Sequence, residues 1–230
     1  MDADNCLTTA SVLQVFSQEI AGHGGSVSDT FDDGERLFVR SILPRIEEVT
    51  TGDQLQGGVA LKAYEGEVWI HPYVFRLVCR NGAIMAQTIT SRRVTAHFAW
   101  DEDEAVTNVR EAVRACCADE VFTSSSRQIR SAREVEADQA LHLLPLLTRM
   151  RGAVGMQLMQ EILKRFFDDG DRTRFGLMNA VTATARDTAD PEMRWDLEEL
   201  GGGIPVDAPG TIPPMPSRGA VRRSRAALVS

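Results

Sequence analysis

Residues 73–88, YVFRLVCRNGAIMAQT, carry the strongest turn signal of the chain. Their centre is the pair Asn81-Gly82. Both residue types tolerate the positive φ angles that a two-residue hairpin turn requires. We therefore predict a strand over residues 73–79, a turn at Asn81-Gly82 and a returning strand over residues 83–88.

The pattern on either side extends this hairpin into a larger sheet. From residue 35 the sequence alternates with a period of two, and further strands are predicted at 58–64 and 93–100. We expect an antiparallel meander over residues 35–100. A helix at 8–21 precedes it, and helical spacing dominates residues 101–201. Strands grouped before helices predict the α+β class.

The chain has 230 residues, enough to bury a core without disulfides or metals. We predict a single domain over residues 1–201. Residues 202–230 contain five prolines, few large apolar groups and several arginines, so we predict a disordered basic tail there.

Composition excludes several classes of protein. Hydrophobic residues make up 43% and charged residues 25%, which is typical of globular domains. No apolar run is long enough to span a bilayer and no signal-peptide pattern is present, so we expect no membrane partner. The four cysteines form no C-x-x-C pair, which favours a reducing compartment. We predict a cytoplasmic protein.

The distribution of charge suggests a binding face. The net charge is −8, yet residues 71–100 contain four arginines and no acidic residue. Guanidinium groups neutralise phosphates, and aromatic rings stack on unpaired bases. We therefore predict contact with single-stranded nucleic acid. The candidate residues are Arg76, Arg80, Arg92, Arg93, Tyr73 and Trp100.

The same pattern has a plainer interpretation. On a half-buried antiparallel strand, Tyr73 would belong to the core face, while Arg76 and Arg80 would form a solvated face. Ordinary sheets commonly have this appearance. The position of the arginines in the folded chain therefore decides between the two interpretations.

Other chemistry has weak sequence support. His71, Cys79 and His97 fall on neighbouring predicted strands, but no pair has the close spacing of metal ligands. No G-x-S-x-G motif or phosphate-binding glycine motif is present. We therefore predict no metal, no cofactor and no catalytic residue.

The stretch RLVCRNG at 76–82, with Gly52-Asp53 upstream, resembles the phage/plasmid-like family of unknown function. Residues 179–182 and Leu197-Glu198 resemble the helical pattern of its C-terminal half. The resemblance covers roughly residues 10–201. It implies a protein of a mobile genetic element and assigns no activity to any residue.

The matched residues also have physical roles. Asn81 and Gly82 are expected to make the turn, Cys79 to pack beneath it and Arg76 to project from the opposite face. Asn179 lies inside a predicted helix, where asparagine is unfavourable, so we expect its side chain to bond a specific partner.

Two functional hypotheses follow. In the first, the chain handles nucleic acid for a mobile element, by binding or annealing single strands through the basic face, and forms a homo-oligomer as phage annealing proteins do. In the second, it is a protein–protein interaction module that acts on a host factor, which the net charge of −8 favours. A hydrolase built on His97 and Asp53 is a third, weaker hypothesis. Clustering of the four arginines on one open face would favour the first hypothesis, and pairing with acids the second.

Overall fold

The computed structural model describes residues 8–86, 92–95, 102–150 and 152–206. An N-terminal helix, an antiparallel sheet and a helical half follow one another, which confirms the α+β class. The strands are β1 (Ser26–Asp32), β2 (Arg36–Ile42), β3 (Ile46–Thr50), β4 (Asp53–Tyr64), β5 (Glu67–Arg76), β6 (Asn81–Ile84) and β7 (Arg92–Thr95). The α-helices are α1 (Thr9–Gly22), α2 (Glu102–Cys116), α3 (Asp119–Ser131), α4 (Gln139–Arg149), α5 (Ala153–Asp169), α6 (Arg174–Arg186) and α7 (Pro191–Gly203). Two short 3-10 helices are η1 (Ala132–Glu134) and η2 (Ile204–Val206).

The strands form one sheet in the order β1-β2-β4-β5-β6, with β3 beside β4 and β7 beside β5. All neighbouring pairs are antiparallel. The long strands β4 and β5 pair along most of their length, from Leu55 opposite Arg76 to Tyr64 opposite Glu67. β5 then pairs with β7 near its start and with β6 near its end.

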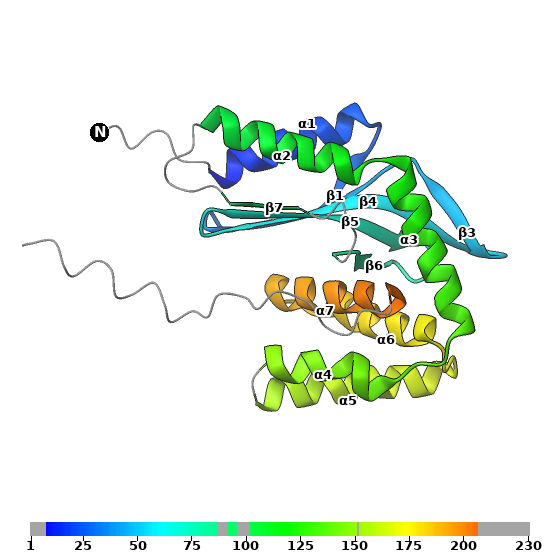
Figure 1. Cartoon of the computed structure of the whole chain (residues 1–230). Coiled ribbons are helices and arrows are strands. Elements are labelled where there is room, and N and C mark those ends of the chain that lie inside the picture. The colour runs from blue at the N-terminus through cyan, green and yellow to red at the C-terminus, as the bar shows by residue number, and fades with distance from the viewer. Residues whose placement is uncertain (1–7, 87–91, 96–101, 151, 207–230) are drawn as a thin grey trace, which may run out of the picture.

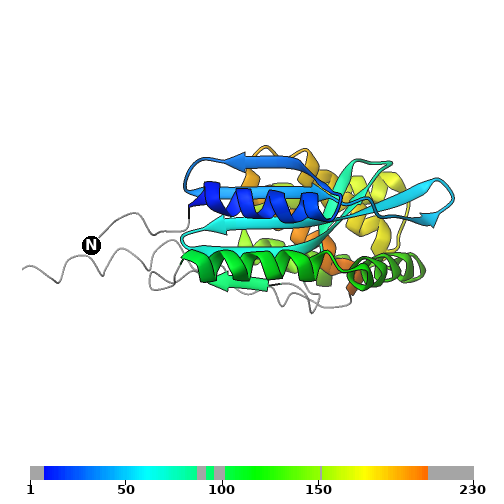
Figure 2. The ribbon, with the colours of Figure 1, turned by 90° about the horizontal axis from the view of Figure 1, so that it is seen from above.

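Helices cover both faces of this sheet (Figure 1). α1 and α2 lie side by side over one face (Figure 2), where Phe16 and Ile20 of α1 pack against Leu37 and Val39 of β2. α6 and α7 lie against the other face, and α3 passes along one end of the sheet from the first helical layer to the second. α4 and α5 form the layer farthest from the sheet.

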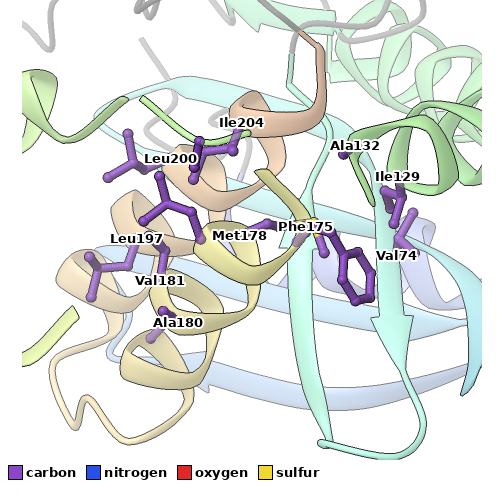
Figure 3. Packing of buried hydrophobic residues seen from close by; sticks show 14 of the residues in the cluster. Val74, Ile129, Ala132, Phe175, Met178, Ala180, Val181, Leu197, Leu200 and Ile204 are labelled. Atoms are coloured by element: carbon purple, nitrogen blue, oxygen red, sulfur yellow. The ribbon is translucent and has the colours of Figure 1, made fainter. Parts of the chain in front are cut away.

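The larger core lies between the sheet and the helices of the C-terminal half (Figure 3). Val74 of β5 and Ile129 of α3 contribute to it from one side, while α6 and α7 contribute most of the other side chains. Those from α6 and α7 include Met178, Val181, Leu197 and Leu200. Because α7 packs directly on β2 and β6, this face of the sheet is interior rather than open.

The predicted turn at Asn81-Gly82 is wrong. The turn comprises residues 77–80, and Arg80 takes the positive φ, 54°. Asn81 and Gly82 begin β6, where Asn81 pairs with Arg76. The side-chain Nδ2 of Asn81 donates to the Thr182 hydroxyl at 2.6 Å, which connects this strand to α6. The observed strands therefore differ from the predicted 73–79 and 83–88, and residues 87 and 88 lie outside the described part.

The boundaries also differ at both ends of the domain. The sheet begins at Ser26, before the predicted start at residue 35, because β1 pairs with β2. At the other end α7 runs through Gly203 and η2 continues to Val206, with Ile204 1% exposed. The chain thus remains packed on the core beyond residue 202, where the tail was predicted to begin. Residues 207–230 lie outside the described part.

Candidate functional site

Arg76, the central candidate, is engaged in an ion pair. It ends β5, and its Nε and Nη2 donate to the two carboxylate oxygens of Asp53 at 2.7 and 2.8 Å. Its Nη1 also donates to the Cys79 sulfur at 3.1 Å. Burial disfavours its charged form, but the hydrogen bonds and charge of Asp53 outweigh this and raise the pKa of Arg76. With its side chain 17% exposed, Arg76 mainly holds the start of β4 to the end of β5.

A second arginine joins this pair. Arg133 Nη1 lies 3.7 Å from Asp53 Oδ2, and its side chain is 35% exposed. The guanidinium carbons of Arg76 and Arg133 lie 5.0 and 4.7 Å from the centre of the Phe175 ring. Arg76 and Arg133 therefore share the carboxylate of Asp53, and the charge of Asp169 also acts on Arg76.

Tyr73 belongs to the core and is not available for base stacking in this structure. It is 3% exposed and lies in the cluster with Phe38 and Trp195. Burial, and then the charge of Glu198, raise the pKa of Tyr73 well above its ordinary value. A Cβ atom on Gly82 would lie 1.9 Å from the Tyr73 hydroxyl oxygen. Gly82 is therefore needed for close packing, not for a turn.

The other predicted contact residues lie in the β5–β6 turn, in β7 or outside the described part of the chain. Arg80 is exposed in the β5–β6 turn. Arg92 and Arg93 are in β7, opposite Ile70 and Trp69, but their side chains lie outside the described part. Trp100, like His97, also lies outside it.

The remaining motif residues support the local structure. The Cys79 carbonyl accepts a hydrogen bond from Arg186 Nη1 at 2.7 Å, so the turn is held to α6. The side-chain oxygen of Asn179 is buried and accepts no hydrogen bond from the described residues. The specific partner predicted for Asn179 is therefore not found at this oxygen.

A buried ionic network was missed by the sequence analysis. Arg40 Nε donates to Glu198 Oε2 at 2.6 Å, and Arg194 Nε donates to Glu198 Oε1 at 3.1 Å. Both arginines also contact Asp29, at 3.2 and 2.8 Å. The side chains of Arg40 and Glu198 are only 3% and 2% exposed. The i,i+4 spacing of Arg194 and Glu198 was the only visible sequence signal, and it does not reveal Arg40.

Of the three residues weighed as metal ligands, His71 and Cys79 are described and His97 is not. Within the described ranges, no three His, Cys, Asp or Glu side chains are placed to hold a metal ion. His71 is instead buried against Trp195, with ring centres 5.9 Å apart. Burial, and then the charge of Lys62, lower the pKa of His71 to about 4.

A cavity of about 550 Å³ lies near the N-terminal end of α1 and the β4–β5 turn. Its titratable lining residues are Glu35, Glu65, Glu67 and Tyr64. Among the described residues no lysine or arginine lines this cavity, so the described lining does not attract phosphate.

The outer surface of α4 is unusually apolar. Leu143 and Leu146 of this helix are buried, while Leu141, Leu144 and Leu147 are 43%, 58% and 37% exposed. The first turn of α5 adds two further exposed apolar residues, Val154 and Met156. Leu141, Leu144, Leu147, Val154 and Met156 are called the α4 surface below. Residues 139–160 contain no acidic residue, although a quarter of the chain is charged.

No helix among the described residues has both the length and the apolar character needed to cross a membrane. Comparison with known proteins found no matching family model, no matching curated protein and no matching solved structure. The resemblance to the phage/plasmid-like family therefore stays a prediction.

Proposed function

We propose that the chain is a protein–protein interaction module that binds its partner through the α4 surface. The observation that carries this proposal is that α4 buries Leu143 and Leu146 and still exposes Leu141, Leu144 and Leu147. A surface helix normally turns its apolar residues to the core and polar residues to the solvent. Covering Leu141, Leu144 and Leu147 with another protein would remove this apolar surface from water, at roughly 25 cal/mol per Å².

The composition around these leucines supports a protein partner. Between Gln139 and Thr148 the only titratable side chain is that of His142, which is buried. A partner can therefore cover the centre of the helix without burying a charge. Depletion of charge at an apolar centre is typical of protein interfaces.

Site-specific photo-crosslinking tests this proposal. Benzoylphenylalanine placed at residue 144 should yield a covalent adduct with a protein in cells that express the chain. Val78 is the matched control, because it is 60% exposed but lies in the β5–β6 turn. Absence of an adduct at residue 144, or equal adducts at both positions, would reject the proposal.

Binding of single-stranded nucleic acid, as part of a mobile element, is the second candidate function. The observation in its favour is that two arginines, Arg76 and Arg133, share the carboxylate of Asp53, while Arg80 is exposed in the neighbouring turn. The binding residues would lie at the β5–β6 end of the molecule rather than across the face of the sheet. Such a site would contact phosphates, with Arg133 and Arg80 as the accessible groups.

Titration of a labelled oligonucleotide at several salt concentrations tests this second candidate. Binding should weaken with added salt, and the variant R80Q/R133Q should bind at least about tenfold more weakly than the wild type. R114Q is the control, because Arg114 is 57% exposed on α2 but pairs with Glu19. No binding at low salt, or equal loss in the control, would reject it.

A further inference from the structure

We infer that the cavity beside the N-terminal end of α1 binds the arginine-rich C-terminal segment of the same chain, residues 218–225. This cavity is called the α1 cavity below. It lies on the α1 side of the sheet, whereas the α4 surface lies in the outermost layer beyond the opposite face (Figure 1). The inference therefore goes beyond the proposed function and is tested separately from it.

The α1 cavity combines buried apolar residues with exposed carboxylates, and its volume is about 550 Å³. Val12 of α1, Ala63 of β4 and Val68 of β5 line it, and each of them is at most 7% exposed. Glu35 of the β1–β2 turn and Glu65 of the β4–β5 turn also line it, and both are exposed. A ligand in this cavity therefore meets an apolar surface and carboxylates together.

The carboxylates of the α1 cavity select a cation. Glu35 and Glu65 form no ion pair with another described residue, and no described lining residue is basic. Arg36 follows Glu35 in the chain but pairs with Asp33, at 2.7 Å. Glu67 is a third acidic lining residue. A positive group placed in the cavity would be attracted by all three glutamates, and a negative group would be repelled.

An arginine side chain matches both parts of the α1 cavity. Its methylene groups pack on apolar surface while its guanidinium group stays at the polar edge. The guanidinium group can also donate two parallel hydrogen bonds to one carboxylate. The buried aliphatic residues of the cavity suit the methylene groups, and its exposed glutamates suit the guanidinium group.

The C-terminal segment supplies arginines with little accompanying negative charge. Residues 207–230 contain one acidic residue, Asp207, and four arginines, which are Arg218, Arg222, Arg223 and Arg225. The other segments outside the described part, residues 1–7, 87–91 and 96–101, contain no lysine or arginine. Residues 1–7 directly precede the cavity but contain two aspartates. Charge complementarity therefore favours the C-terminal segment as the occupant.

The segment is long enough to reach the α1 cavity from the end of the helical half. The described chain ends at Val206, and Arg222 follows sixteen residues later. Sixteen residues extend over up to about 55 Å. A compact domain of about 200 residues has a radius of gyration of about 16 Å, so it is about 40 Å across. Attachment to the same chain also gives the arginines an effective concentration of about 1 mM, so exposed ion pairs suffice for binding.

Photo-crosslinking within the full chain tests this inference. Benzoylphenylalanine at residue 221 should form adducts with peptides that line the α1 cavity, mapped by mass spectrometry of the monomer. The adduct yield should fall by at least about threefold in the cavity variant E35Q/E65Q, because exposed ion pairs are lost. The control variant E111Q/E120Q removes two exposed carboxylates outside the cavity and should keep the wild-type yield. Circular dichroism checks that both variants are folded.

Proteolysis gives a second readout without a crosslinker. Trypsin cleaves after arginine, so a segment bound in the α1 cavity should be cut slowly at Arg222 and Arg223. The cavity variant should be cut at these positions at least about threefold faster than the wild type at low salt. This difference should disappear at high salt, which screens exposed ion pairs. The control variant should be cut at the wild-type rate.

The opposite results overturn the inference. Adducts that are absent, or that join only two copies of the chain, show that the segment does not bind its own cavity. Cavity adducts from benzoylphenylalanine at residue 5, with none from residue 221, assign the cavity to the residues that precede α1. Equal effects in the cavity and control variants show that general charge holds the segment. None of these results changes the residue-144 adduct, which tests the proposed function by itself.

Discussion

Arg40 and Glu198 are 158 positions apart in the chain, yet the Arg40 Nε donates to the Glu198 Oε2 across 2.6 Å in the interior. Arg40 lies in β2 and Glu198 in α7, so this contact joins the sheet to the helical half. Arg194 and Asp29 extend it toward the surface. The network belongs to the fold rather than to a binding site, and its loss should be measurable as a loss of stability.

Removing the charge of Glu198 should strongly destabilise the protein. E198Q keeps the shape of the side chain but removes the buried carboxylate that Arg40 contacts most closely and leaves it the more exposed Asp29. We expect the free energy of unfolding to fall by about 3 kcal/mol. Urea unfolding followed by circular dichroism measures this change. E161Q is the control, because Glu161 pairs with Arg165 at the surface and should cost less than about 0.5 kcal/mol. An equal loss of unfolding free energy in E198Q and E161Q would contradict the structural role of Glu198.

His71 should make the protein less stable in acid. Its pKa is lowered to about 4 in the folded chain, from 6.5. The unfolded chain therefore binds a proton between these values while the folded chain does not, so stability falls as the pH drops from about 6.5 to about 4. The contribution reaches at most about 3 kcal/mol. H71Q should show a flatter stability curve over this range than the wild type.

Other groups also titrate in acid, so the comparison needs a matched variant. The pKa values of Asp33 and Asp187 are lowered, mainly by hydrogen bonds from Arg36 and Arg186, and these pairs also lose stability at low pH. H23Q retains His71 and should keep the wild-type slope. If H71Q and H23Q have the same slope, the burial of His71 does not control the acid response.

A methyl group at residue 82 should disturb the β5–β6 pair. In G82A the new Cβ would lie 1.9 Å from the Tyr73 hydroxyl oxygen, so Tyr73 must move within the core. We expect the free energy of unfolding to fall by about 2 kcal/mol. At Gly22, at the end of α1, a Cβ would meet nothing within 4 Å. G22A should therefore be neutral or stabilising by up to about 1 kcal/mol. Thermal unfolding compares the two variants, and similar melting temperatures would contradict this account of Gly82.

Asp53 should be required to hold Arg76 and Arg133 together. D53N removes the carboxylate that both guanidinium groups contact beside the buried Phe175 ring, and we expect the free energy of unfolding to fall by about 2 kcal/mol. E47Q is the control, because Glu47 contacts Arg130 at the surface, at 3.4 Å. Chemical unfolding of both variants measures the difference. A D53N protein as stable as E47Q would show that the pair contributes little.

Local patterns predicted much of the architecture. The helix expected at 8–21 is observed at Thr9–Gly22, because its apolar residues recur with the helical period. The alternation after residue 35 correctly indicates strands, as β2 shows. These features depend on residues within one or two turns of each other, so no distant contact was needed to predict them.

The failures involve contacts between distant segments. Asn81-Gly82 has the local character of a turn, but Thr182 and Tyr73 position these residues in a strand. Alternation indicates that Tyr73 and Arg76 point to opposite faces of the sheet, but it cannot tell that helices cover both faces. The predicted nucleic-acid face depended on that missing information.

The sequence by itself determined the order of helix, strands and helices and the α+β class, because hydrophobic periodicity operates over a few residues. Only the tertiary structure decided which charges are neutralised and which apolar side chains stay exposed. Asp53 meets Arg133, and Arg40 meets Glu198, through the packing of segments about 80 and 158 positions apart. The exposed leucines of α4 are distinguishable from its buried ones only once α5 and α7 have packed against the other side of the helix.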